Sequence, residues 1–175
     1  SGMADLDATV EIGPQLDLTL WRSPDRAQQL KLILPVRSAF TLSSPPRHAG
    51  WVFSPALNLD MVDPPGLPGW RLGVRSGPIF ATRRQHAYYY QVSPAEARPE
   101  RPEYAASGGY SGTQVLAALS RRYPRHWVGA FVRYDMLQHA AFDDSPLAAR
   151  DHYLAAGVAV AWIFGESSER VNVDD

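Results

Sequence analysis

The chain has 175 residues, enough for one domain with a substantial core. Its formal net charge of -1 gives no reason to expect a nucleic acid or a strongly acidic partner. The absence of cysteine excludes disulfides, thiolate catalysis and cysteine metal sites. No apolar run approaches the roughly 20 residues of a membrane helix, and the 15 prolines and 13 glycines favour many turns over long helices.

The first half of the chain alternates apolar and polar side chains, which is the period of a strand with two different faces. Val10 and Ile12, for example, lie on one face of a strand at 8–22, and Glu11 and Asp17 lie on the other. Turns rich in proline, serine and glycine separate the next three strands. We expect these strands at 29–42, 51–61 and 70–80.

The second half predicts four further strands and two long loops. We expect the strands at 87–92, 110–122, 127–137 and 152–164, with the long loops at 93–109 and 138–152. The closing strand has one face of mostly small residues and one large apolar face. The large face consists of Leu154, Ala156, Val158, Val160, Trp162 and Phe164.

Four prolines fall inside these expected strands, namely Pro14, Pro35, Pro55 and Pro78. Proline cannot donate a ladder hydrogen bond and belongs at sheet edges, strand starts or bulges. A closed barrel has no edges. We therefore expect bulges at these positions, or strands shorter than the alternation implies.

Regular strands with turn signals and no helical period indicate an all-β sandwich or barrel. Several runs reach the roughly 9–11 residues that cross a bilayer, and the last connections alternate long and short, as in outer-membrane barrels. The expected fold is therefore an antiparallel up-and-down β-barrel of about eight strands, of the outer-membrane type, or part of a larger barrel. We expect residues 1–165 to form this single domain and 166–175 to form an acidic tail.

On this frame the outward face carries aromatic residues near both membrane boundaries, as in an aromatic girdle. The expected lipid-facing aromatics are Trp51, Trp70, Trp162 and Phe164. We place Trp51 and Trp162 near the periplasmic boundary and Trp70 near the outer one. Trp21 and Trp127 fall on the polar face and do not fit this arrangement.

The opposite face mixes charges of both signs, which a narrow barrel can pair across a filled interior. The expected barrel-interior charges are Glu11, Asp17, Lys31, Arg37, Arg71, Arg75, Arg133 and Asp135. The alternation alone also allows a solvated outer face of an open sandwich.

The sequence assigns no catalytic residue, metal ligand or cofactor. The histidines fall in expected loops or at strand ends, without a partner at metal-ligand spacing: His48, His86, His126, His139 and His152. Ser145 and His152 share a loop and form a candidate nucleophile and base. Asp-Ser-Pro is nevertheless ordinary turn chemistry, so we favour a turn at Ser145. Gly108 to Gly112 is interpreted as a glycine-permitted bend.

Several segments follow one another in a recognisable order. They include the tyrosine-rich run Tyr88–Ser93, the segment from Arg101 to Tyr110, and Arg133–Leu137, Asp144–Leu147 and the aromatic closing strand. Upstream, Glu11–Pro14, Leu34–Arg37 and Gly50–Pro55 continue the match. Together these segments, from about Asp7 to Phe164, resemble the MipA/OmpV family.

This resemblance implies an outer-membrane protein of Gram-negative bacteria with a structural or scaffolding role in cell-wall (murein) synthesis. One member is known to connect a lytic transglycosylase to a penicillin-binding protein. The implied partners are therefore these two enzymes and outer-membrane lipid, without nucleic acid. No catalytic residues are established for the family, and we expect no enzymatic activity. Members usually carry a signal peptide and further strands before the segment matching Asp7, so we expect this chain to lack the family's N-terminal strands.

Two other functions fit the alternation. In the first, a soluble or periplasmic β-barrel binds a small apolar ligand, with the apolar face pointing inward. In the second, the protein is an outer-membrane lipid hydrolase that uses a serine and a histidine.

Overall fold

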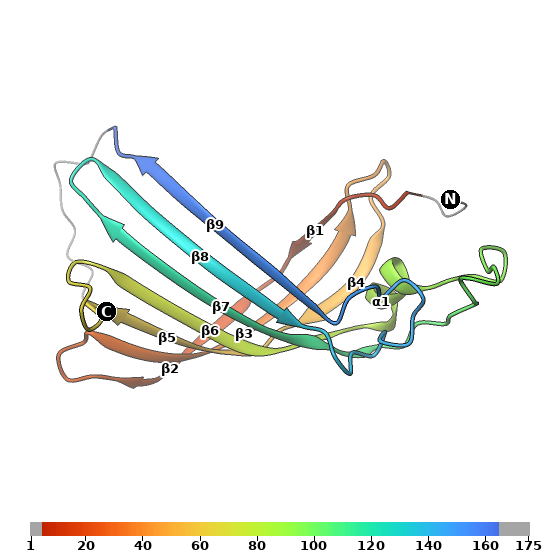
Figure 1. Ribbon diagram of the computed structural model, residues 1–175, viewed down its shortest axis with the longest axis horizontal. Helices are drawn as coiled ribbons and strands as arrows, with labels where there is room; N and C mark the ends of the chain where they lie inside the picture. Colours follow the sequence, from red (N-terminus) through yellow and green to blue (C-terminus); the bar gives the residue numbers. More distant parts are fainter. Residues whose placement is uncertain (1–4, 165–175) are drawn as a thin grey trace.

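The computed structural model describes residues 5–164, which form one antiparallel β-sheet and a short helix (Figure 1). The elements in chain order are β1 (Thr9–Ile12), β2 (Gln15–Arg22), β3 (Gln28–Thr41), β4 (His48–Phe53), β5 (Ala56–Val62), β6 (Arg71–Ala81), α1 (Arg83–Tyr90), β7 (Gly109–Arg122), β8 (His126–Met136) and β9 (His152–Trp162). Apart from β1 with β2 and β4 with β5, strands that follow one another along the chain pair in the sheet. The prediction of an all-β, antiparallel up-and-down fold is confirmed.

The nine strands follow seven paths across the sheet, because two paths are interrupted. β1 and β2 both pair with β3, and β4 and β5 each pair with β3 and β6. The interruptions contain Pro14 and Pro55, whereas Pro35 and Pro78, the other two prolines of the expected strands, lie within β3 and β6. The alternating runs at 8–22 and 51–61 therefore do form strands, but each run consists of two strands with a break between them.

The four prolines lie side by side across adjacent paths and are called the proline row here (Pro14, Pro35, Pro55 and Pro78). The Val36 amide donates to the Pro14 carbonyl (3.0 Å), and the Ser54 amide donates to the Pro35 carbonyl (3.4 Å). Extending the register of β5 and β6 by one residue places Gly77 opposite Ala56, the first residue of β5. Pro78 is the residue after Gly77 in β6. Prolines that lack a ladder donor thus gather on one line across the sheet instead of weakening it at scattered points.

Backbones approach closely beside the proline row. A Cβ added to Gly77 would lie 2.0 Å from the Pro55 carbonyl oxygen, and one added to Gly13 would lie 1.9 Å from that of Val36. No side chain fits at such distances. These two glycines are therefore required by the close approach of neighbouring strands.

The strand expected at 87–92 is wrong, because residues 83–90 form α1. The helix begins after Thr82, whose carbonyl accepts from the His86 amide (3.1 Å), and no side chain caps it. Tertiary contacts hold it instead. Tyr88 OH donates to the Asp7 carbonyl (2.8 Å), and Tyr89 OH shares a hydrogen bond with Thr9 Oγ1 (2.8 Å).

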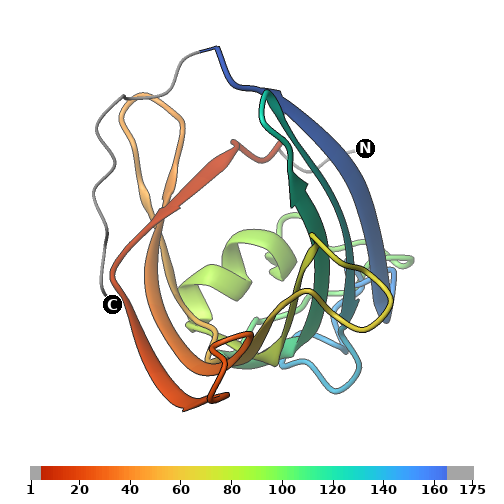
Figure 2. The ribbon, with the colours of Figure 1, turned by 90° about the vertical axis from the view of Figure 1, so that its left-hand side faces the viewer.

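The sheet curls around α1, which lies inside the curve (Figure 2). Within residues 5–164, β9 pairs only with β8, and β1 and β2 pair only with β3. The curled sheet is therefore barrel-like, with β9 and the β1–β2 path as its two edges. Because the meander has seven paths, these two edges run in the same direction.

The two ends of the sheet differ in their connections (Figure 1). One end, the loop end, carries α1 and the long connections 82–108 and 137–151, together with the turn at 42–47. The other, the turn end, carries the connections 23–27, 63–70 and 123–125.

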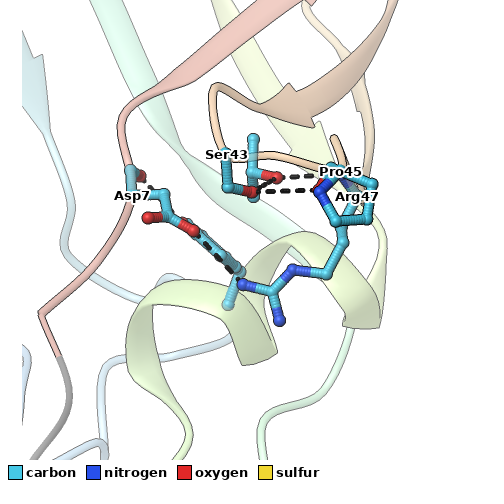
Figure 3. A network of polar contacts seen from close by, with 6 residues as sticks. Asp7, Ser43, Pro45 and Arg47 are labelled. Carbon is cyan, nitrogen blue, oxygen red and sulfur yellow. Dashed lines mark hydrogen bonds and ion pairs between the residues drawn. The ribbon is translucent and has the colours of Figure 1, made fainter.

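The loop end also fixes the start of the described chain. The Arg47 guanidinium forms an ion pair with Asp7 (3.2 Å), and Ser43 Oγ donates to the Pro45 carbonyl (3.3 Å) beside it (Figure 3). Residues ahead of β1 are thereby tied to the turn between β3 and β4.

The most deeply buried side chains gather at this loop end. Ala39, Val92, Ala106 and Phe142 are almost inaccessible, at 0%, 1%, 2% and 4% exposed. Of these four residues, Val92, Ala106 and Phe142 lie in the long connections, and only Ala39 lies in a strand. The core is therefore the contact between α1, the long loops and the concave face of the sheet.

Candidate functional site

The register places the eight predicted interior charges on the concave face of the sheet. Glu11, Arg37, Arg75 and Arg133 line a hollow there, next to α1. Arg71 lines a second hollow toward the turn end. The remaining three are Asp17, Lys31 and Asp135. Directly paired residues share a face of a sheet, and the pairs Asp17 with Ile33, Lys31 with Asn58 and Asp135 with Gln114 place these three charges on the concave face as well.

Two of the arginines in the hollow are neutralised by neighbours. Arg37 pairs with Glu11 across strands (3.4 Å), and Arg133 pairs with Asp135 two residues along β8 (3.0 Å). The Asp135 carboxylate also accepts from Gln114 Nε2 (2.8 Å). Charges of opposite sign thus meet within the curve, which lowers the cost of removing them from bulk water.

α1 contributes a buried histidine to the hollow. His86 is 2% exposed, and its Nδ1 lies 2.6 Å from the Ser107 carbonyl oxygen. A carbonyl only accepts, so Nδ1 carries the proton. Nε2 of the neutral ring is then the acceptor for the Ser111 hydroxyl, at 2.7 Å. Burial lowers the pKa of His86 more than the Ser107 hydrogen bond raises it, which favours the neutral ring.

A serine hydroxyl that donates to a neutral imidazole makes the same hydrogen bond as a serine nucleophile makes to its general base. The same contact also fastens α1 to the start of β7, because His86 and Ser111 come from these two elements. Both ring nitrogens have partners and the ring packs edge-on against Phe142, with centroids 5.0 Å apart. These contacts are sufficient to explain why a histidine is buried here.

The loop 137–151 closes over α1. The Phe142 ring stacks on Tyr90 with centroids 3.8 Å apart and an interplanar angle of 6°. Burial also raises the pKa of the Tyr90 phenol. Tyr104 OH donates to the Ala141 carbonyl (3.0 Å), so the other long connection joins the same contact. The hollow is consequently covered at the loop end.

Ser145 belongs to this cover. Its hydroxyl donates to the Tyr90 carbonyl (2.7 Å) and accepts from the Leu147 amide (3.2 Å). His152 is exposed at the start of β9, with its ring tilted against Tyr134. The structure therefore gives Ser145 a role in loop geometry and does not join it to His152.

The hollow has a volume of about 390 Å³. Its lining combines the three arginines and Glu11 with Gln85, His86, Tyr89 and Tyr90 of α1. Small residues of the sheet and larger apolar side chains complete it, among them Val52, Ile79, Leu137 and Phe142. Such a site can bind a polar ligand through hydrogen bonds and charge. A purely apolar ligand would leave these polar groups without partners.

We expect replacement of His86 by alanine to lower the free energy of unfolding by about 1–3 kcal/mol, because it leaves buried partners unsatisfied. A lowered pKa means that the unfolded chain binds this proton more readily. The stabilisation from His86 is thus present above the ordinary histidine pKa and declines as the pH falls below it.

Denaturant unfolding measured between pH 5 and pH 8 tests the effect of this substitution. His86→Ala should remove part of the loss of stability at low pH. His152→Ala, at an exposed ring, is the control for the loss of stability itself, because it leaves no buried partner unsatisfied. A His86→Ala variant with the stability and pH dependence of the wild type would contradict the assignment.

The convex face carries most of the predicted outward aromatics, but their distribution between the ends differs from the expectation. Trp51 exchanges hydrogen bonds with Thr82 and so lies at the loop end. Trp162 pairs with His126 beside the turn 123–125, and Trp70 lies at that same turn end, 6.0 Å from the Arg121 guanidinium. The expectation that Trp51 and Trp162 share a boundary is wrong, because α1 replaces one expected crossing. Phe164, beyond β9, is 98% exposed.

The position of Trp21 also differs from the expectation, which placed it on the polar face. Strict alternation puts it with Asp17 on the polar face, but a bulge between Thr19 and Trp21 shifts the register by one residue. Trp21 then pairs with Leu30 and shares its convex face, with 48% of its surface exposed. Trp127 does lie on the concave face, where its ring covers Gly129.

The contact between His86 and Ser111 is the part of the site that sequence reasoning missed. The sequence places His86 just outside an expected strand and Ser111 in a glycine-rich bend, 25 positions apart. No short motif connects them. Only α1, folding back into the sheet, brings the two side chains together.

Among residues 5–164, no group of three or more histidine, aspartate or glutamate side chains is arranged to hold a metal ion. The same stretch contains no helix of the length and apolarity needed to span a membrane.

Comparison with known proteins gives one match. The family model described as MltA-interacting protein MipA matches residues 1–164. No curated protein and no solved structure matches the chain.

Proposed function

Because the chain belongs to the MipA family of MltA-interacting proteins, we propose that it is a non-catalytic outer-membrane β-barrel protein that acts as a scaffold in murein synthesis. The observation that carries this proposal is the family match over residues 1–164. The scaffold role extends the interaction that the family description names.

The distribution of apolar side chains supports a membrane location. Val158, Leu154 and Leu57, on the convex face, are 87%, 63% and 49% exposed. The charged side chains of Glu11, Arg37, Arg75 and Arg133 line the concave face instead. A surface that is apolar outside and polar inside is typical of outer-membrane barrels. The charged side chains that line the concave face argue against the alternative with the apolar face pointing inward.

The difference between the two ends supports an orientation. Outer-membrane barrels have short periplasmic turns and longer outer loops. The turn end would therefore face the periplasm, where a lytic transglycosylase works on murein. Arg121 lies over the Tyr123 ring (4.9 Å) there, and Tyr123 stacks on His126 (4.5 Å). These side chains form an ordered surface at the turn end for a protein partner.

The absence of catalysis is part of the proposal. The Ser111 hydroxyl is hydrogen-bonded to His86 in a contact that also fastens α1 to β7. The hydrolase alternative would require this serine, since the Ser145 hydroxyl is engaged by the Tyr90 carbonyl of α1 and by the Leu147 amide. Under our proposal, Ser111 has a structural role.

We expect the purified chain in lipid nanodiscs to bind a lytic transglycosylase of the MltA type. Substitution Tyr123→Ala should weaken this binding about tenfold, as removal of a central aromatic contact does at protein interfaces. Surface plasmon resonance with immobilised transglycosylase measures the change.

The matched control is Arg47→Ala at the loop end, which should leave the affinity unchanged. If the wild type does not bind, the scaffold proposal fails. If Arg47→Ala weakens binding and Tyr123→Ala does not, the proposed orientation is wrong.

A further inference from the structure

The hollow on the concave face carries more positive than negative charge. Arg37, Arg75 and Arg133 line it, together with one carboxylate, that of Glu11. Glu11 is occupied by Arg37, and Arg133 uses Asp135. Within the described part of the chain, Arg75 has no ion pair. It is therefore the arginine whose charge is available to a ligand.

Asp17 interacts with Arg75 at longer range but forms no ion pair with it. Asp17 lies on the concave face of β2, where its carboxylate accepts from Gln15 Nε2 (2.8 Å). His86 adds hydrogen-bonding capacity but no negative charge. The described side chains around the hollow thus leave the Arg75 guanidinium without a direct ion pair, next to the positive charge of Arg37, in a site partly removed from water. Such a charge attracts an anion more strongly than an exposed arginine does.

Two buried polar atoms point to the same conclusion. Arg133 Nε has no acceptor and Gln85 Oε1 has no donor, although both side chains line the hollow. Gln85 is 6% exposed, so its orphaned oxygen is costly. A bound molecule with an oxyanion and a hydroxyl or N–H group would satisfy both atoms.

The positions of the arginines suit a single ligand. Arg75 pairs with Leu116, and Leu116 pairs with Arg133, so the two arginines are two strands apart in one row. At the usual strand spacing their backbones lie about 10 Å apart, within reach of two converging arginine side chains. The volume of about 390 Å³ accommodates a small molecule.

We propose that this hollow binds a small soluble oxyanion, a carboxylate or phosphate compound, with Arg75 as its principal charged contact and Arg133 as the second. The three arginines in the lining and the cover formed by α1 and the loop 137–151 disfavour a lipid acyl chain. This site does not depend on the scaffold role, because it lies inside the curve and not at the turn end.

The test uses the full chain folded in micelles of an uncharged detergent. Inorganic phosphate and acetate are titrated separately, with chloride keeping the ionic strength constant, and binding is followed by isothermal titration calorimetry. We expect saturable binding of at least one of the two anions. Arg75→Gln should weaken it at least tenfold, and Arg75→Lys, which keeps the charge, should weaken it less.

The matched control is Arg71→Gln, on the same strand and face but in the second hollow. It should change the affinity less than twofold. No saturable binding of either anion would overturn the proposal, as would an equal loss in Arg71→Gln. Binding seen only when phosphatidylglycerol is added to the micelles would identify a lipid site and also overturn it. If Arg75→Gln fails to fold, the Arg75→Lys variant still decides the outcome.

Discussion

Gly77→Ala should strongly destabilise the sheet. The new Cβ would lie 2.0 Å from the Pro55 carbonyl oxygen and 2.7 Å from the Ala56 Cα. Both are backbone atoms, so no side-chain rotation relieves the clash. We expect a loss of about 3 kcal/mol or more in the free energy of unfolding, at the upper end of overpacking effects. Urea unfolding followed by tryptophan fluorescence measures it.

Gly73→Ala is the matched control, because it adds the same methyl group to the same strand. Its nearest contact would be Asp60 Oδ1 at 3.4 Å, which is an ordinary approach. We expect a change within about 1 kcal/mol of the wild type. Equal stabilities of the two variants would show that β5 and β6 are not in close contact beside the proline row.

Val132→Arg should impair assembly into a membrane. Val132 is near the middle of β8, faces outward with Ala117 and Ala156 beside it, and is 44% exposed. An arginine on the lipid face near the bilayer centre costs about 2–4 kcal/mol. We expect this loss in urea unfolding from lipid vesicles, together with less of the heat-modifiable, folded band on a denaturing gel.

Ala118→Arg provides the comparison for the concave face. Ala118 lies on the adjacent strand, pairs with Phe131 and lines the second hollow, where there is room for a longer side chain. The arginine should there remain in a polar environment and cost less than Val132→Arg. If Ala118→Arg costs as much or more in vesicles, the convex face does not contact lipid.

Much of the sheet follows from the sequence because strand periodicity is a local property. The opposite faces of β9 and the position of Glu11, Arg37 and Arg133 on one side result from alternation alone. Turn residues mark most strand ends for the same reason. One expected crossing of the sheet was nevertheless wrong: 87–92 falls largely in α1, because its tyrosines suit a strand or a packed helix equally well.

The break points and bulges could be anticipated only in part. Pro14 and Pro55 are visible as obstacles in the sequence, but their alignment with Pro35 and Pro78 depends on strand register. The bulge that moves Trp21 to the convex face has no marker in the sequence. Register depends on hydrogen bonds between distant residues, so alternation within one strand does not reveal it.

The candidate site could likewise be predicted from the sequence only in part. Its arginines could be assigned to one face from the sequence, because each lies on an alternating strand. Three further features could not be predicted: the burial of His86, its hydrogen bond to Ser111 and the lack of an ion pair at Arg75. Each depends on which side chains α1 and the neighbouring strands bring within a few ångströms.

The fold class, the polarity of the two faces and the family resemblance can be read from the sequence, because all three rest on local order and spacing. Three features became evident only in three dimensions: residues 83–90 enter the curve as a helix, the two edges run in the same direction, and the hollow is basic. The physical reason is that packing and electrostatic compensation are sums over neighbours in space, and most of these neighbours are far apart in the chain.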